Sequence, residues 1–142
     1  MRFWDTSALV PLILEEPASR ACRRELRADS GMVVWILTRV EVVSAIRRLV
    51  RENALTPAEA TTALRRLEER AVRWTEVEAV ADARFRAERL LGVHPLRAAD
   101  ALQLGAALTF FGDVPRGRVF LTRDGELAAA AAREGFTVVE PA

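Results

Sequence analysis

Four acidic residues occupy positions in this sequence where most neighbours are apolar: Asp5, Glu41, Asp100 and Asp124. An ionised carboxylate close to a hydrophobic core costs several kcal/mol unless the charge is paired or binds a metal ion. Carboxylates that share one crevice also repel each other, and each raises the pKa of its neighbours. A hard divalent cation such as Mg²⁺ or Mn²⁺ reverses that repulsion, because it prefers oxygen ligands. These four side chains therefore predict a shared cation site.

Two of the acids, Asp5 and Asp124, come at or just after the ends of β-rich segments. In open α/β sheets the ligand crevice lies at the carboxyl ends of the strands, so both side chains should face one crevice if their strands are neighbours. Each acid also has a simpler interpretation as the N-cap of the helix that follows it. Thr6 or Ser7 offers an alternative cap after Asp5, and their hydroxyls are suited to bind a water or a phosphate beside it.

The other two acids, Glu41 and Asp100, lie in helical patterns. Glu41 is early in an amphipathic helix, where the helix dipole and Arg48 give an alternative reason for an acid. Asp100 has poor helix propensity and lies in an otherwise apolar helix, which favours a ligand role over a simple ion pair with Arg97. An all-carboxylate site is typical of enzymes that hydrolyse phosphodiesters with one metal ion, or with two that lie about 4 Å apart.

Short β-rich segments alternate with longer helical patterns, which predicts a parallel sheet covered by helices on both faces. Strands are expected at residues 2–5, 32–35, 72–77, 118–122 and 137–140. Helices are expected at residues 7–14, 18–28, 38–52, 56–70, 80–91, 96–111 and 124–133. The segment Thr56-Pro57-Ala58-Glu59 is a capping box with proline at the first helical position. The helices before and after it should therefore form an antiparallel hairpin.

With 142 residues and 51% hydrophobic content, the chain fits one domain, residues 1–142, with a sizeable core. Cys22 and His94 are the only residues of their types, which excludes an intrachain disulfide and metal sites rich in cysteine or histidine. A lone cysteine favours a reducing compartment, and the N-terminus lacks the apolar segment of a signal peptide. No apolar run approaches the roughly 18 to 20 residues of a membrane-spanning helix. We therefore expect a cytoplasmic protein with no membrane partner.

The net charge of +1 conceals an arginine-rich surface, because all 21 basic residues are arginine. Guanidinium groups bind phosphates in a bidentate manner, so Arg39, Arg97 and Arg123 are candidates for holding a phosphate backbone near the acids. Codon bias or a hot habitat would equally explain a lysine-free chain, and most of these arginines need no functional role.

The order of these motifs resembles the PIN-domain family, and within it the VapC-type ribonuclease toxins of toxin and antitoxin pairs. The segments that carry the resemblance are DTSAL at the start, RVEVVSAI around Glu41, RAADALQLGAAL around Asp100 and TRDGELAAAAAREG around Asp124. The resemblance spans essentially the whole chain. It implies a single PIN-like α/β domain whose parallel sheet has four to five strands in the order 3-2-1-4-5, flanked by about seven helices.

The resemblance also implies an activity, in which four acids form a Mg²⁺- or Mn²⁺-dependent catalytic site that cuts RNA. By this likeness the catalytic and metal-binding residues are Asp5, Glu41, Asp100 and Asp124. The supporting residues are Thr6, Ser7, Thr122 and Arg97. The partners that the resemblance implies are an RNA substrate, a second copy of the chain in a homodimer, and a small antitoxin that covers or fills the active groove.

Three other interpretations fit parts of the sequence. The first is a housekeeping PIN nuclease of RNA processing, and a gene for a small DNA-binding protein immediately upstream would favour the toxin instead. The second is a phosphotransfer or phosphatase domain phosphorylated on Asp5, but such phosphatases usually carry a second aspartate two positions later, where this chain has Ser7. The third is a non-catalytic binding module in which the acids act only as caps and ion pairs.

Overall fold

A computed structural model describes residues 1–142 and contains one five-stranded, fully parallel sheet with strand order β3-β2-β1-β4-β5. The strands are β1 (Arg2–Trp4), β2 (Met32–Trp35), β3 (Thr75–Val77), β4 (Val119–Leu121) and β5 (Thr137–Val139). The predicted order is confirmed. The central strand β1 lies between β2 and β4, and the chain reverses its winding direction there, which is the usual place for a ligand crevice in such sheets.

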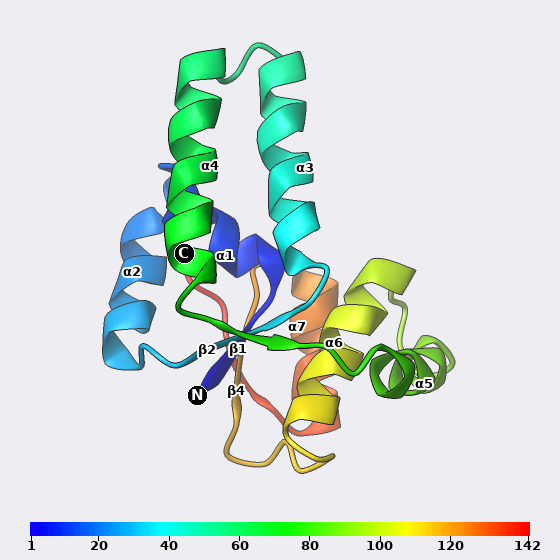
Figure 1. Ribbon diagram of the computed structural model, residues 1–142. Helices are drawn as coiled ribbons and strands as arrows, with labels where there is room; N and C mark the ends of the chain where they lie inside the picture. The colour runs from blue at the N-terminus through cyan, green and yellow to red at the C-terminus, as the bar shows by residue number, and fades with distance from the viewer.

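Seven helices connect the strands, as predicted (Figure 1). Their bounds are α1 (Thr6–Ile13), α2 (Ser19–Ala28), α3 (Thr38–Arg51), α4 (Pro57–Ala71), α5 (Val80–Leu91), α6 (Ala98–Phe110) and α7 (Gly125–Glu134). None of them is both long and apolar enough to cross a membrane.

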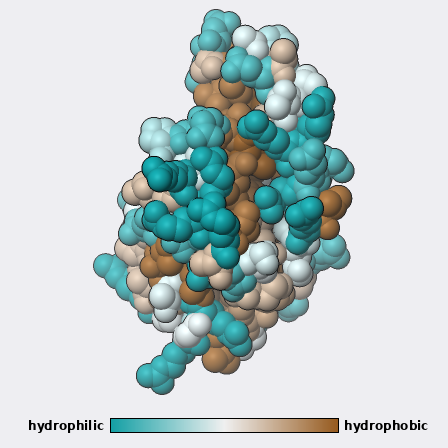
Figure 2. Space-filling model, turned by 90° about the vertical axis from the view of Figure 1, so that its left-hand side faces the viewer, coloured by the Kyte–Doolittle hydropathy of each residue, from teal (hydrophilic) through white to brown (hydrophobic).

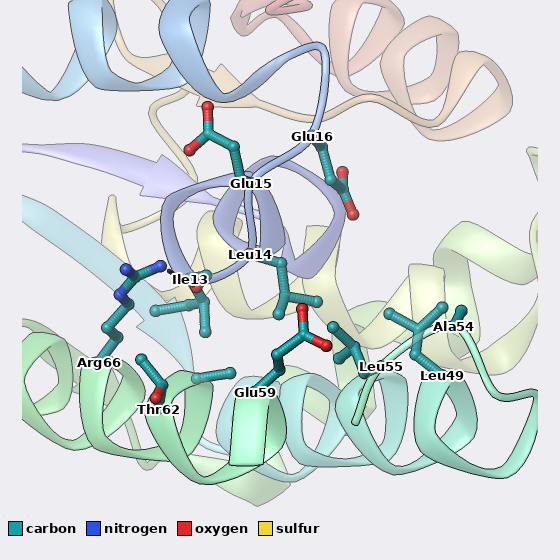
Figure 3. A pocket seen from close by; sticks show the side chains of 11 residues that line it. Ile13, Leu14, Glu15, Glu16, Leu49, Ala54, Leu55, Glu59, Thr62 and Arg66 are labelled. Atoms are coloured by element: carbon teal, nitrogen blue, oxygen red, sulfur yellow. Dashed lines mark hydrogen bonds between the residues drawn. The ribbon is translucent and has the colours of Figure 1, made fainter. Parts of the chain in front are cut away.

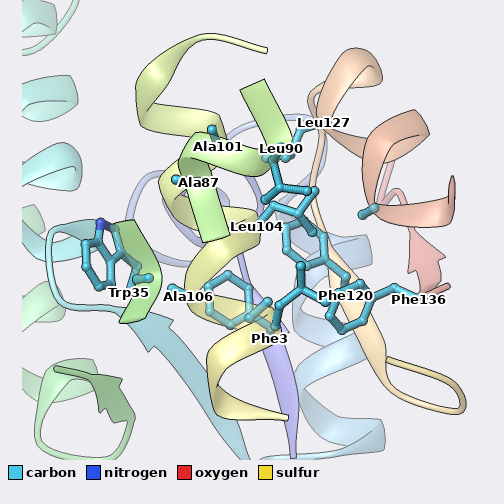
Figure 4. Close-up of a cluster of buried hydrophobic side chains, with 14 of the residues drawn as sticks. Phe3, Trp35, Ala87, Leu90, Ala101, Leu104, Ala106, Phe120, Leu127 and Phe136 are labelled. Carbon is cyan, nitrogen blue, oxygen red and sulfur yellow. The ribbon is translucent and has the colours of Figure 1, made fainter. Parts of the chain in front are cut away.

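Alternating strand residues supply two hydrophobic cores, one on each face of the sheet. Phe3 and Phe120 stack with ring centroids 5.2 Å apart in the core formed with α5, α6 and α7 (Figure 4). Their neighbours Trp4 and Leu121 point to the opposite face, where they pack against helices α1 to α4. Strands buried on both faces are expected to be almost continuously apolar, as these are. The loop after each strand therefore begins at the carboxyl end of a sheet that is packed on both faces.

The helices α3 and α4 form the predicted antiparallel hairpin, which extends beyond the sheet in Figure 1. The capping box at its turn is confirmed: the Glu59 backbone N–H donates to Thr56 Oγ1 at 3.1 Å, and the Thr56 N–H donates to Glu59 Oε1 at 3.0 Å. The hairpin packs into the core on this face of the sheet through residues such as Val42, Ile46 and Leu67.

Two predicted boundaries were wrong, and the second of them affects the site. β3 begins at Thr75 rather than at residue 72, because Val72 ends α4 and is 76% exposed. α6 begins at Ala98, two residues later than predicted, since Leu96 and Arg97 are not helical. Asp100 therefore lies in the first turn of α6 and not in its interior.

Gly105 explains how α6 packs so closely against α5. A methyl group at this position would lie 2.6 Å from the Ala83 carbonyl oxygen, well inside the contact distance of real Cβ atoms. The absence of a side chain lets the two helix backbones approach each other. This contact fixes the position of α6, which carries Asp100.

Candidate active site

All four acids predicted from the sequence line a single pocket of about 360 Å³. Each lies at the N-terminus of a different helix: Asp5 caps α1, Glu41 is in the first turn of α3, Asp100 is in the first turn of α6 and Asp124 caps α7. Helix N-termini carry partial positive charge from unpaired N–H groups, so four of them together favour anions in this pocket. The remaining lining residues are Thr6, Ser7, Ser44, Ala45 and Arg48.

Asp5 is the most deeply placed acid and is only 4% exposed. Its Oδ2 accepts hydrogen bonds from Ser7 Oγ at 2.6 Å, the Ser7 backbone N–H at 3.2 Å and Thr122 Oγ1 at 2.9 Å. Its Oδ1 accepts none and is left for another partner. Burial raises the pKa of Asp5, while the hydrogen bonds from Ser7 and Thr122 lower it. The predicted alternative, a cap supplied by Thr6 or Ser7, was wrong, because Asp5 itself caps α1 and still lines the pocket.

Both carboxylate oxygens of Glu41 are held by neighbouring side chains. Oε2 accepts from Thr6 Oγ1 at 3.1 Å, and Oε1 accepts from Gln103 Nε2 at 3.3 Å. Burial raises the pKa of Glu41, and the negative charges of Asp5 and Asp100 raise it further, against the two hydrogen bonds. The alternative pairing with Arg48 is absent, since the ion pairs of the structure do not include one between them.

The pocket also disfavours the ionisation of Asp100. Burial, followed by the charges of Asp124 and Asp5, raises its pKa to about 6. Arg97 precedes the helix, is exposed, and forms no ion pair with Asp100; its charge lowers the pKa only partly. The simple ion pair considered from the sequence therefore does not form.

Asp124 caps α7 and also lines the pocket. Its Oδ1 accepts the capping hydrogen bond from the Leu127 backbone N–H at 2.8 Å. The hydroxyls of Ser7 and Thr122 lie 3.2 Å apart beneath it, and Thr122 Oγ1 accepts from the Asp124 backbone N–H at 3.1 Å. Ser7 and Thr122 thus join the loops after β1 and β4.

The arginines at the pocket differ from those suggested by the sequence. Arg39 forms an ion pair with Glu68 on the hairpin. Arg123 donates to the Pro141 carbonyl at 3.2 Å and lies 3.5 Å from Glu16. Arg48 lies on α3 seven residues after Glu41, and it is the arginine that lines the acidic pocket.

Sequence reasoning missed the site roles of Gln103 and Arg48. The signal for Arg48 was its position seven residues after Glu41, which places both on one helix face. The signal for Gln103 was a polar residue three positions after Asp100 inside an apolar helix. Both were visible in the sequence, but neither the direction of the side chain nor the neighbouring helix could be read from spacing alone.

The donor set of the pocket fits Mg²⁺ or Mn²⁺. It consists of carboxylate and hydroxyl oxygens, which these cations prefer, and the mutual repulsion of the acids would be relieved by a positive ion. No three acidic side chains form a ready-made group that could hold an ion directly. Mg²⁺ commonly keeps several waters and takes only one or two protein carboxylates, so an open arrangement of this kind suits it.

We predict that Asp100→Asn stabilises the metal-free protein at pH 7 but not at pH 4. The raised pKa of Asp100 means that the folded state holds the proton more tightly than the unfolded state. Below the ordinary value of 3.8 both states are protonated, and stability is lost as the pH rises from there to about 6. The gain at pH 7 should be roughly 1 kcal/mol, because water screens this half-exposed group.

Urea unfolding at both pH values in the presence of chelator measures this effect. Asp82→Asn is the matched control, because Asp82 is an exposed first-turn acid of α5, away from the pocket. It should be neutral or slightly destabilising at pH 7. A loss of stability in Asp100→Asn that is equal at the two pH values would contradict the clustered site.

Three solved structures share this fold over nearly the whole chain. FitAcB from Neisseria gonorrhoeae has a TM-score of 0.68 and 18% identity, covering 99% of this chain and 98% of that one. A toxin-antitoxin complex from Klebsiella pneumoniae has a TM-score of 0.63 and 19% identity, covering 100% and 98%. VapC20 from Mycobacterium tuberculosis, described as a Sarcin-Ricin loop cleaving toxin, has a TM-score of 0.68 and 19% identity, covering 99% and 100%.

Sequence comparison assigns the family. No curated protein is significantly similar to this chain. The family model of the PIN domain, however, matches residues 2–133, which is nearly the full length. The four acids of the pocket lie within the matched residues, at the carboxyl edge of a sheet with the predicted strand order. The chain therefore belongs to the PIN domain family.

Proposed function

We propose that this protein is a metal-dependent endoribonuclease whose active site is the pocket lined by the four acids. The observation that carries the proposal is the meeting of four carboxylates, each on a separate helix N-terminus, in one pocket of a PIN domain. Asp5, Glu41, Asp100 and Asp124 are the metal-binding and catalytic residues. When bound, Mg²⁺ or Mn²⁺ would supply a water of lowered pKa and positive charge for the developing oxyanion.

The residues of the chain supply orientation and charge for this reaction. Asp5 is fixed by three donors on Oδ2, so that Oδ1 is presented to the pocket in one direction. Thr6 holds Glu41, and Ser7 and Thr122 hold Asp5, which gives the three hydroxyls supporting roles. Fixed polar groups of this kind need no reorganisation during the reaction, which is the main source of electrostatic catalysis.

Arg48 is the best candidate for contact with a phosphate of the substrate. It lies in the pocket beside the acids and has no carboxylate partner in the structure. Charge-assisted hydrogen bonds from guanidinium to phosphate are strong and often bidentate. The exposed Arg97 stays a secondary candidate, because it precedes the helix that carries Asp100.

RNA is the proposed substrate class, and toxin action is the proposed biological role. Both are supported by the resemblance of the four motifs to VapC-type toxins and by the structural likeness to VapC20, which is described as cleaving the Sarcin-Ricin loop. A phosphatase role is less well supported, since Ser7 replaces the second aspartate and its hydroxyl donates to Asp5. A housekeeping nuclease would use the same pocket.

A small antitoxin is the proposed partner, and an apolar groove offers it a surface. A hydrophobic band runs between hydrophilic side chains on the side of the molecule seen in Figure 2. A pocket of about 450 Å³ lies between the C-terminal end of α1 and the hairpin, as Figure 3 shows in detail. Its apolar lining consists of Ile13, Leu14, Leu49, Ala54, Leu55 and Ala63. The structural similarity of this chain to a toxin-antitoxin complex from Klebsiella pneumoniae supports the proposal.

Self-association into a homodimer is also proposed, on the basis of the resemblance to VapC-type toxins. Two large apolar side chains at the start of α3, the helix that carries Glu41, are open to solvent, with Leu37 45% and Val40 57% exposed. Covering them in a homodimer would remove apolar surface from water near the active site. A chain that is monomeric by light scattering at micromolar concentration would contradict this proposal.

The nuclease activity is tested by incubating purified protein with single-stranded RNA, structured RNA and DNA. We expect cleavage of RNA with Mg²⁺ or Mn²⁺ and none with chelator. Asp5→Asn and Asp100→Asn should each lower the rate at least ~100-fold, because each removes a charge that binds the metal. Asp82→Asn, an exposed acid outside the pocket, should keep wild-type activity. Cleavage that persists in chelator, or in both pocket variants, would rule out the proposed mechanism.

Arg48→Ala should raise KM about 10-fold with a smaller change in kcat, since a phosphate contact outside the reacting bond contributes mainly to substrate binding. The matched control is Arg47→Ala, a neighbouring exposed arginine that does not line the pocket. Steady-state cleavage of a fluorescent RNA measures both constants. Equal effects of the two substitutions would show that only general surface charge matters.

The antitoxin groove is tested by a pair of adjacent threonines on α4. Thr62 lines the groove and Thr61 does not, yet both are exposed and both donate to the carbonyl four residues earlier. Thr62→Arg should abolish co-purification with the product of an adjacent small gene, while Thr61→Arg should leave it intact. Intact complex formation by Thr62→Arg would place the partner elsewhere.

A further inference from the structure

Gln103 is a fully buried amide on α6, and its exposed fraction is 0%. It lies one turn after Asp100, and its helix neighbours Ala101, Leu104 and Gly105 are buried too. The residue does not line the acidic pocket itself. Its side chain reaches away from the apolar core of α6 toward α1 and α3. Gln103 therefore lies behind the residues that line the pocket and contacts two of them, Thr6 and Glu41.

The amide nitrogen of Gln103 contacts three oxygens. Nε2 lies 2.9 Å from Thr6 Oγ1, 3.1 Å from Thr38 Oγ1 and 3.3 Å from Glu41 Oε1. The Thr6 hydroxyl in turn donates to Glu41 Oε2 at 3.1 Å. Because that hydroxyl donates its single proton to Glu41, its oxygen must accept from Gln103. The amide nitrogen has two protons, so the three contacts share them, and the contact with Glu41 is the longest. Gln103 thus contacts one carboxylate oxygen of Glu41 directly and the other through Thr6.

The orientation of the Gln103 amide leaves one of its two polar atoms without a partner. Oε1 of Gln103 is buried and has no hydrogen-bond partner. An unsatisfied buried acceptor is destabilising, and leucine or methionine would fill the same space in this apolar helix without leaving one. Reversing the amide would point Oε1 at the Glu41 carboxylate, which also repels it. The arrangement is explained if the donor group is needed at Glu41.

We propose that Gln103 is a positioning residue of the active site, which fixes the Glu41 carboxylate in one orientation toward the metal ion. The proposal rests on the proposed function, because it assigns Glu41 to a Mg²⁺ or Mn²⁺ site. Partners behind the ligands of a metal ion typically change its affinity or the activity 10- to 100-fold when they are removed. The competing role is purely structural, with Gln103 joining α6 to α1 and α3 through Thr6 and Thr38.

Gln103→Met separates the two roles, because methionine has similar volume and removes the unsatisfied acceptor together with the donor. We expect the variant to keep or raise the melting temperature of the metal-free protein. In calorimetric titration with Mn²⁺ alone, without RNA, we expect its Kd to be at least ~10-fold weaker than that of the wild type. Thr109→Val is the control on the same helix, since the Thr109 hydroxyl bonds only to the Gly105 carbonyl, at 2.8 Å. It should bind Mn²⁺ as the wild type does.

A folded Gln103→Met protein that binds Mn²⁺ with unchanged Kd would overturn the proposal and leave the proposed nuclease function standing. Wild-type protein that binds no Mn²⁺ would overturn both. If Gln103→Met does not fold, Gln103→Leu is measured in the same way, since leucine matches the neighbouring residues of α6. Failure of both variants to fold would assign the amide to the structure of the domain and would also overturn the proposal.

Discussion

The candidate site depends on the convergence of four helix N-termini at the carboxyl edge of one parallel sheet. Burial raises the pKa of Asp5, and burial together with the charges of the neighbouring carboxylates raises the pKa of Glu41 and of Asp100. The unpaired N–H groups at the helix ends oppose this rise, and so do the hydroxyls of Thr6, Ser7 and Thr122. The folded chain thus holds four carboxylates in one pocket.

The rest of the fold holds those helix ends together. β1 and β4 are neighbours at the point where the strand order reverses, so the loops that follow them meet, and Asp5 is bonded to Thr122 at 2.9 Å across that boundary. The two cores fix the sheet between α1 to α4 on one face and α5 to α7 on the other. Gly105 lets the backbones of α5 and α6 lie in close contact, and α6 carries Asp100.

Much of this arrangement was predictable from the sequence, because it follows from local patterns. The alternation of strands and helices gave the parallel sheet, and the positions of Asp5 and Asp124 after β-rich segments gave their convergence. The first turn of α6 was not predicted, since Leu96 extends the apolar pattern of the helix without being helical, and Asp100 was therefore assigned to a helix interior. The contacts of Gln103 with α1 and α3 depend on tertiary packing, which spacing along one helix does not encode.

The most direct test of the four-carboxylate metal site is an anomalous difference map from crystals of the protein soaked in Mn²⁺. A peak between the N-termini of α1, α3, α6 and α7, with at least one carboxylate oxygen of Asp5, Glu41, Asp100 or Asp124 within the ~2.0–2.3 Å of a metal–oxygen bond, is the predicted result. A pocket without a peak at millimolar Mn²⁺, or a peak bound only by residues elsewhere, would contradict it.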